Sequence, residues 1–285
     1  MTTDMSTIED APIDAPPPSP RRRTSWVVTL VTVTGVILVA IIALQAVSLG
    51  VSTGSGVRSA SYTADVEGVT SLDIGVSAGD LTVTFAEVDQ AQLEVTGSGW
   101  RDNTDWRLEV EDGRLVVRED DDWWFFWPNF GSSRTTADLV LPSELEGEVA
   151  ADLDVSSGEM SVDGDLQAVA IDVSAGSLTF IGASTSLDAE VSAGNATVVT
   201  DGPDEVHARV SAGRFTGTVT GPPPSRTSVD VSAGDVVLDL PDAEYAVSGD
   251  VSAGDRTIEV RTDPSSPHLL DVQVSAGDAT IGYSD

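Results

Sequence analysis

Acidic residues recur along this chain at positions where their carboxylates could gather. A four-residue phrase, Val-Ser-Ala-Gly, is repeated, and the residue after its glycine is aspartate at Asp235, Asp255 and Asp278. Carboxylate oxygens are the ligands that Ca²⁺ prefers, with about six to eight around each ion. Weak calcium binding at these three residues is one prediction. A solvated acidic face is the preferred interpretation, because the spacing differs from that of the glycine-rich nonapeptide calcium repeat.

The residue before each valine of the phrase forms a second candidate column. Its members are Asp154, Asp172, Glu190, Arg209, Asp230, Asp250 and Gln273. The serines of the phrase are equivalent in every copy, so no single serine is set apart as a nucleophile. The two histidines, His207 and His268, lie far apart in the repeat and support neither a triad nor a metal site. We therefore expect no enzyme activity, no catalytic residue and no cofactor.

An aromatic segment interrupts the repeats. It lies within an insertion spanning residues 118–134, follows three aspartates, and contains Trp123, Trp124, Phe125, Phe126, Trp127 and Phe130. Such residues dominate binding hot spots. One prediction is therefore a contact site for a protein, a glycan or a peptide. The competing interpretation is a flap that covers the first layer of the fold and hides an open sheet edge.

The phrase itself determines the fold prediction. Its glycines are Gly79, Gly158, Gly176, Gly194, Gly213, Gly234, Gly254 and Gly277, and from Val155 onward the copies start 18, 18, 19, 21, 20 and 23 residues apart. Apolar and polar residues alternate on both sides of each copy, which is typical of strands with one buried face. We expect the valine and alanine of the phrase to face inward and the serine outward. The glycine should supply an unusual backbone angle at a corner.

Each repeat of about 20 residues therefore predicts a strand, a corner and a second strand, stacked on the next repeat with like over like. The predicted fold is an all-β, β-solenoid domain preceded by one transmembrane helix. A sandwich of ordinary hairpins is the rival prediction. In the irregular stretch between the phrases at Val76 and Val155, Asp112-Gly113 predicts a tight hairpin turn.

Composition limits the function. The 285 residues carry a net charge of −33 and no cysteine. The charge argues against nucleic-acid binding, which requires a basic face. The absence of cysteine excludes disulfides and thiolate metal sites.

The N-terminal residues predict a membrane anchor. Residues 1–25 form a polar tail that ends near Arg21-Arg22-Arg23, and residues 26–49 are apolar and uncharged. This length can cross a bilayer, and the arginines place the tail in the cytoplasm. A cleaved signal peptide is the alternative, although its apolar region would be shorter. Residues 50–60 predict a flexible stalk, and residues 61–285 the extracytoplasmic domain.

The repeated phrase, the single span and the tryptophan-rich interruption together resemble the bacterial putative-adhesin family of β-strand-repeat, membrane-anchored proteins. That resemblance implies a surface-displayed module that adheres to a partner or acts as a spacer at the cell envelope. An envelope-stress sensor that binds an extracytoplasmic ligand is the alternative function, and a polysaccharide-active enzyme is a third. The resemblance supplies no catalytic or binding residues.

Overall fold

The computed structural model describes residues 57–98, 105–120 and 134–284, all within one compact unit, Gly56–Asp285. The predicted tail, membrane span and most of the stalk lie outside the described residues. So do the six aromatic residues from Trp123 to Phe130. Among the described residues, no helix is both long enough and apolar enough to cross a membrane.

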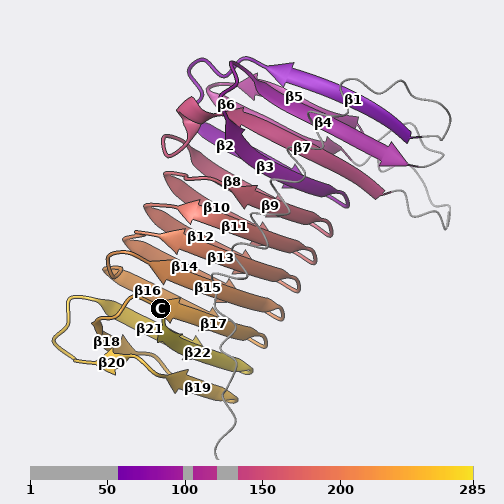
Figure 1. The fold of residues 1–285 in the computed structure, drawn as a ribbon. Helices are drawn as coiled ribbons and strands as arrows, with labels where there is room; N and C mark the ends of the chain where they lie inside the picture. The colour runs from indigo at the N-terminus through magenta and orange to yellow at the C-terminus, as the bar shows by residue number, and fades with distance from the viewer. Residues whose placement is uncertain (1–56, 99–104, 121–133, 285) are drawn as a thin grey trace, which may run out of the picture. The chain divides into compact units, whose positions relative to one another are not determined.

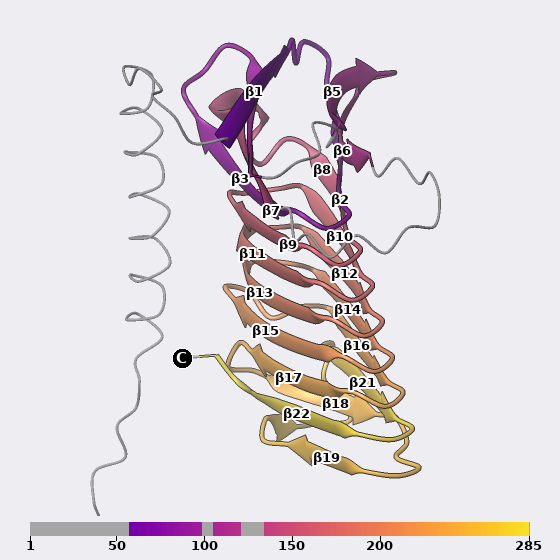
Figure 2. The ribbon, with the colours of Figure 1, turned by 90° about the vertical axis from the view of Figure 1, so that its right-hand side faces the viewer.

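The described chain is all-β, as predicted, and forms two sheets of eleven strands each that face one another (Figures 1 and 2). Sheet A contains, in spatial order, β1 (Val57–Ala64), β4 (Ala91–Ser98), β7 (Arg134–Pro142), β3 (Asp80–Ala86), β9 (Glu159–Asp163), β11 (Ser177–Ala183), β13 (Asn195–Asp201), β15 (Arg214–Thr220), β17 (Asp235–Leu240), β22 (Asp278–Tyr283) and β19 (Asp255–Ile258). Sheet B contains β20 (Arg261–Thr262), β18 (Glu244–Ser248), β21 (Leu269–Val274), β16 (Arg226–Val231), β14 (Glu205–Val210), β12 (Ser186–Val191), β10 (Ala168–Val173), β8 (Ala150–Val155), β2 (Ser71–Val76), β6 (Arg114–Asp120) and β5 (Asp105–Glu111). A short 3₁₀ helix, Ser143–Leu145, precedes β8.

The repeats stack in register. We define a coil as one strand of sheet B, the corner that follows it and the next strand of sheet A. The strand residues of a coil pair, in a parallel arrangement, with the equivalent residues of the neighbouring coils. Val173 pairs with both Val155 and Val191, and Ser177 pairs with both Glu159 and Asn195. The prediction that like lies over like is confirmed, and pairing of this kind is inconsistent with ordinary hairpins for the repeats.

The core lies between the two sheets. Along β10 the side chains of Val169, Ile171 and Val173 are buried, and Ala168, Ala170 and Asp172 between them are partly or fully exposed. The opposing sheet contributes the two largest buried side chains of the regular coils, Phe180 and Phe215. This alternation confirms the predicted strands with one buried face.

The corners differ from the prediction in one respect. In the copies at Val173 and Val191 the valine and glycine are buried, but the alanine, Ala175 or Ala193, is exposed. The serine and alanine both lie on the outside of the bend, and their N–H groups donate to the preceding coil. Ser174 N donates to Val155 O at 2.9 Å, and Ala175 N to Ser156 O at 2.8 Å. A small residue suits this exposed bend, but it does not fill the core.

The corner glycines are required mainly by a close approach. A Cβ added at Gly234 would lie 2.5 Å from Val210 Cγ1 and would collide with the carbonyl oxygen of Gly213, both in the preceding coil of β14 and β15. The described corners before it, including Gly176, have ordinary negative φ. Among the glycines of the repeated phrase, only Gly254 and Gly277 take positive φ, at 94° and 102°. The predicted need for an unusual backbone angle is therefore wrong for the regular coils.

The irregular stretch between β3 and β8 extends one end of both sheets. β6 pairs in parallel with β2, and β7 with β3, on the side away from the regular coils. Beyond them the pairing becomes antiparallel, with β4 against β7 and β1, and β5 against β6. The predicted turn joins β5 and β6: Asp112 and Gly113 have φ of 50° and 77°, as a two-residue hairpin turn requires.

The spatial order reverses at the other end. The coil of β21 and β22 lies between that of β16 and β17 and that of β18 and β19, although β18 and β19 precede it in sequence (Figure 1). Val274 pairs with Val231 on one side and with Val251 on the other. Stacking of the phrases strictly in sequence order is therefore wrong for the last two copies.

Residues outside the repeated phrase hold this arrangement. Tyr283 Oη accepts a hydrogen bond from Arg261 N at 2.6 Å and lies 3.3 Å from Ala243 O. Arg256 Nη1 donates to Gly249 O at 2.7 Å and to Val272 O at 3.1 Å. The Arg256–Val272 and Tyr283–Ala243 contacts bridge the β18–β19 coil and the inserted coil of β21 and β22, and the Arg256–Gly249 bond lies within the former.

Candidate interaction surface

The outward side chains of sheet B form the predicted acidic column. Strand pairing places Asp154, Asp172, Glu190, Arg209, Asp230 and Gln273 on consecutive strands. The reversed order moves Asp250 to the far side of Gln273, instead of between Asp230 and Gln273. The column is thus confirmed as a surface feature, with a different order at one end.

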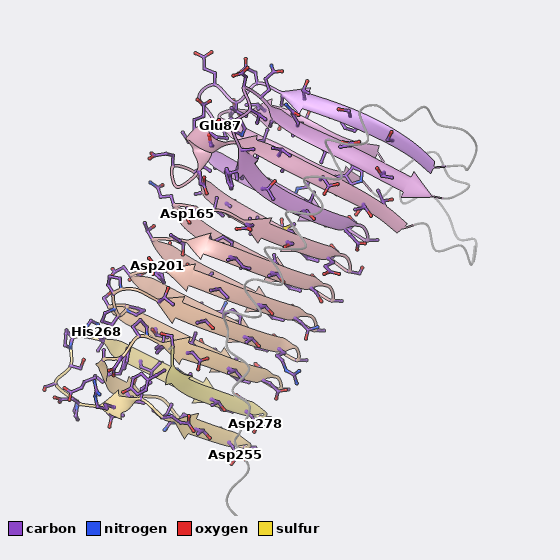
Figure 3. All side chains as sticks on the ribbon, viewed as in Figure 1. Glu87, Asp165, Asp201, Asp255, His268 and Asp278 are labelled. Carbon is purple, nitrogen blue, oxygen red and sulfur yellow. The ribbon has the colours of Figure 1, made fainter. Side chains whose placement is uncertain are left out.

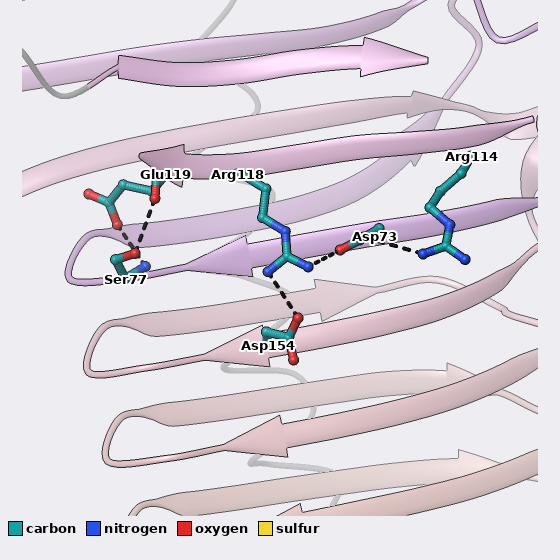
Figure 4. Close-up of polar contacts among 6 residues, drawn as sticks. All are labelled: Asp73, Ser77, Arg114, Arg118, Glu119 and Asp154. Atoms are coloured by element: carbon teal, nitrogen blue, oxygen red, sulfur yellow. Dashed lines mark hydrogen bonds and ion pairs between the residues drawn. The ribbon is translucent and has the colours of Figure 1, made fainter. Parts of the chain in front are cut away.

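Arginines neutralise part of this column. Arg118 pairs with Asp73 and, 3.0 Å away, with Asp154, so that it bridges two coils (Figure 4). Gly75 lies beneath the guanidinium, and a Cβ there would lie 2.5 Å from Arg118 Nη1. The absence of a side chain at Gly75 therefore lets Arg118 reach Asp154.

Asp172 has a carboxylate on each side of it in this column. It is stacked between Asp154 and Glu190, whose cationic partners are Arg118 and Arg209, the latter 3.4 Å from Glu190. Partial burial, and then repulsion from Asp154 and Glu190, raise the pKa of Asp172 above its usual value. The column is therefore a mixed-charge surface with a local excess of negative charge.

The three aspartates predicted as a weak calcium site occupy consecutive strands of sheet A. The order is Asp235, Asp278, Asp255, and Figure 3 shows Asp278 and Asp255 at the corner end of β22 and β19. Arg214 Nη2 lies 3.0 Å from Asp235, and Asp278 Oδ1 accepts the N–H of Asp255 at 3.2 Å. Among the described residues no three acidic or histidine side chains are grouped to hold a metal. Calcium binding stays a prediction.

The two histidines serve separate contacts. His207 Nε2 lies 2.9 Å from a guanidinium nitrogen of Arg209 on the outer face of sheet B. His268 Nδ1 lies 2.8 Å from Pro224 O, beside the inserted coil. The structure does not bring them together.

A buried carboxylate at the end of the corner stack was not anticipated. Oε2 of Glu119 accepts the backbone N–H groups of Ser77, Ala78 and Gly79 at 3.0, 2.9 and 2.9 Å. Figure 4 shows Glu119 beside Ser77. In later coils the N–H groups at the serine and alanine positions donate to carbonyl oxygens of the neighbouring phrase, as Ser174 N and Ala175 N do. The first corner has no phrase before it, so Glu119 takes that role, and its side chain is 6% exposed.

Glu119 also marks where the aromatic segment departs. β6 ends at Asp120 and β7 begins at Arg134, so residues 121–133 replace the short corner of the other coils. The insertion predicted at residues 118–134 stays a prediction, and its residues 118–120 belong to β6. The aromatic side chains themselves lie outside the described residues, and their role as a contact site or a flap stays a prediction. Of the tryptophans, Trp106 is described, and it is buried.

No protein-family model and no curated protein matches the chain. Three solved structures resemble it in fold. A putative cell adhesion protein from Clostridium sporogenes is 14% identical with a TM-score of 0.38, covering 80% of this chain and 100% of that one. A putative lipid binding protein from Parabacteroides distasonis is 14% identical with a TM-score of 0.48, covering 79% and 98%. A putative adhesin from Bacteroides fragilis is 15% identical with a TM-score of 0.33, covering 82% and 100%. At these TM-scores, none of the three assigns a function to this chain.

Proposed function

We propose that residues 61–285 form a β-solenoid that a single N-terminal helix displays outside the bacterial cytoplasmic membrane, where it acts as an adhesin-like interaction or spacer module. The observation that carries the proposal is the uniform register. From β8 to β17 each coil presents its side chains at the positions used by its neighbours. A repeated surface of this kind suits contact with an extended partner more than a reaction at one point.

The sequence supports the location. Residues 26–49 carry no charge and follow three arginines, a pattern typical of a span with its N-terminus in the cytoplasm. The net charge of −33 keeps such a module soluble and disfavours acidic partners. Family membership among the putative adhesins is part of the same proposal.

The test measures two properties, the side of the membrane on which the β-rich part lies and its binding to envelope material. We expect external protease to remove the β-rich part from intact cell-wall-stripped cells, while the tail remains protected. We also expect the full chain to retain envelope material in a pull-down, and Trp123→Ser, Trp124→Ser and Trp127→Ser together to abolish that capture with unchanged melting. Protection of the β-rich part would contradict display, and loss of folding in the triple variant would favour the flap.

A further inference from the structure

A row of hydroxyl groups crosses the outer face of sheet A. Strand pairing places Thr82, Ser161, Thr179, Thr197 and Thr216 at one position of five consecutive strands, β3, β9, β11, β13 and β15. We call these five residues the hydroxyl row. Val237 follows on β17 and is 39% exposed.

Around Thr179, Thr197 and Thr216 of the hydroxyl row the outer face is nearly uncharged, in contrast to sheet B, whereas Asp80, Glu159 and Asp163 flank the first two members. On β11, β13 and β15 the outward residues two positions later are Ile181, Val199 and Thr218. Two positions earlier they are Ser177, Asn195 and Arg214, and Arg214 is paired with Asp235. In a chain with a net charge of −33, nine neighbouring outward positions thus include one charge, and that charge is neutralised.

The hydroxyls of the row are available to a ligand. Within the part of the chain that the structure describes, the side chains of the row donate to or accept from no other protein group. The backbone groups of the same strands are already used, because β11, β13 and β15 pair with one another along their lengths. A ligand lying on this face therefore meets free hydroxyl groups and aliphatic side chains, but no free backbone.

These features select the class of ligand. With strands about 4.8 Å apart and alternate residues about 6.7 Å apart, the three strands and three columns of the uncharged patch cover roughly 10 by 13 Å. That area, on the order of 100 Å², is well below the roughly 800 Å² per partner of a stable protein interface. A second copy of the chain is therefore a poor fit.

An extended peptide fits poorly as well, because it would find no backbone partner on the face and would keep its own N–H and C=O groups unpaired there. An acidic polymer would be repelled by the charge of the chain. A neutral polysaccharide carries hydroxyls on every unit and apolar C–H faces between them, and each unit could meet one coil in the same way. Repetition of a weak contact along one chain raises the total affinity without any strong single site.

We propose that Thr179, Thr197 and Thr216 of the hydroxyl row, with their aliphatic neighbours, bind one strand of an uncharged polysaccharide that runs across the strands of sheet A. The proposal rests on the proposed function as an interaction module, and it assigns the contact to sheet A in addition to the aromatic segment.

The test uses the full chain in detergent with suspensions of microcrystalline cellulose, chitin and curdlan as neutral probes, and heparin-agarose as an acidic one. We expect depletion from solution by at least one neutral probe and none by heparin. Thr179→Val, Thr197→Val and Thr216→Val together should weaken that binding by about tenfold or more, since each removes one hydrogen bond. Valine keeps the side-chain shape and favours strands, so melting should not fall. Ser186→Val with Ser228→Val, on the outer face of sheet B, is the matched control.

Three outcomes would contradict the polysaccharide proposal. Absence of binding to all three neutral probes, or equal binding by the triple variant, overturns the proposal. A change of oligomeric state in the triple variant, measured by light scattering, would assign the face to self-association instead. If the neutral probes fail but envelope material is still captured, the sheet A proposal is wrong and the interaction module stands.

Discussion

The carboxylate of Glu119 lies against the backbone of Ser77, with Oε2 3.0 Å from Ser77 N, and the same oxygen also accepts two further N–H groups. Every corner after this one donates its N–H groups toward the preceding coil, so the stack of corners begins with N–H groups that no other corner can accept. Glu119 places a negative charge where those aligned donors end, as an acidic residue does at the N-terminus of a helix.

Glu119→Ala should lower the free energy of unfolding by about 2–4 kcal/mol, because it leaves buried N–H groups without acceptors. Glu119→Gln keeps one acceptor oxygen without the charge and should cost about half as much. Denaturant unfolding of the full chain measures both. Glu148→Ala, at an exposed position, is the control and should change little. Equal stability of Glu119→Ala and the wild type would show that water can replace the carboxylate.

Gly234→Ala should destabilise the fold by about 2–3 kcal/mol, as overpacking does in a rigid site. The new Cβ would press on Val210 Cγ1 and on the carbonyl of the coil below. Gly97→Ala is the control, since a Cβ there has nothing within 4 Å and φ is not positive. The difference in melting between these two variants isolates the close approach of the coils. A Gly234→Ala protein as stable as Gly97→Ala would contradict it.

Asp172→Asn should raise the free energy of unfolding at neutral pH by roughly 0.5 kcal/mol, because like charges on adjacent strands repel and the group is exposed enough to be screened. The folded-state pKa of Asp172 lies above the unfolded value, so the folded protein binds more protons between those two values. Stability attributable to this group therefore rises as the pH falls through the folded pKa toward the unfolded one.

That pH dependence gives a second readout. Unfolding curves at pH 7 and at about pH 4 should show a smaller gain on acidification for Asp172→Asn than for the wild type. Burial also raises the pKa values of Asp138 and Asp163. Both proteins should therefore keep the part of the acid-induced increase in the free energy of unfolding that comes from these two residues. Asp89→Asn, in an exposed loop, should leave the wild-type gain intact. An identical acid response in Asp172→Asn would mean that the stacked carboxylates do not repel measurably.

Tyr283→Phe should cost about 1–2 kcal/mol, because it removes the hydroxyl that joins Arg261 N to Ala243 O and leaves the ring in place. Hydrogen exchange should show faster opening of β18, β20 and β21 than of β10 and β12, because the lost bonds lie at one end of the stack. Tyr62→Phe, in β1, provides the control. Uniformly faster exchange across both sheets would argue against a local role.

Much of this fold could be predicted from repetition alone. The spacing of the phrases predicted the coils, and the similarity of the phrases predicted the pairing of Val155 with Val173 and Val173 with Val191. Alternation predicted which side chains of β10 are buried. The acidic column on sheet B followed from the same register, because a residue at a fixed distance from each phrase must recur on each strand.

What repetition cannot predict is which copy lies next to which. The phrases at Val251 and Val274 are equivalent, so either could stack on Val231. Tyr283, Arg256 and Arg261 decide between them through contacts that have no counterpart in other coils. The role of Glu119 could not be predicted for the same reason, because a single glutamate among 47 acidic residues does not recur at a fixed position of the repeat. The corner alanine was misplaced because strand alternation does not continue through a bend.

The reversed order of the last two coils has a consequence for biogenesis. The chain emerges from the ribosome with β18 and β19 ahead of β21 and β22, and N-terminal parts begin to fold first. Most coils can add to the growing stack as they are made. The coil of β21 and β22 must instead take its place between neighbours that are both already synthesised. β18 and β19 therefore cannot reach their final partners until β21 and β22 have been made, and a stalled chain ending before Leu269 would leave the edge of β16 and β17 open to pairing with another strand.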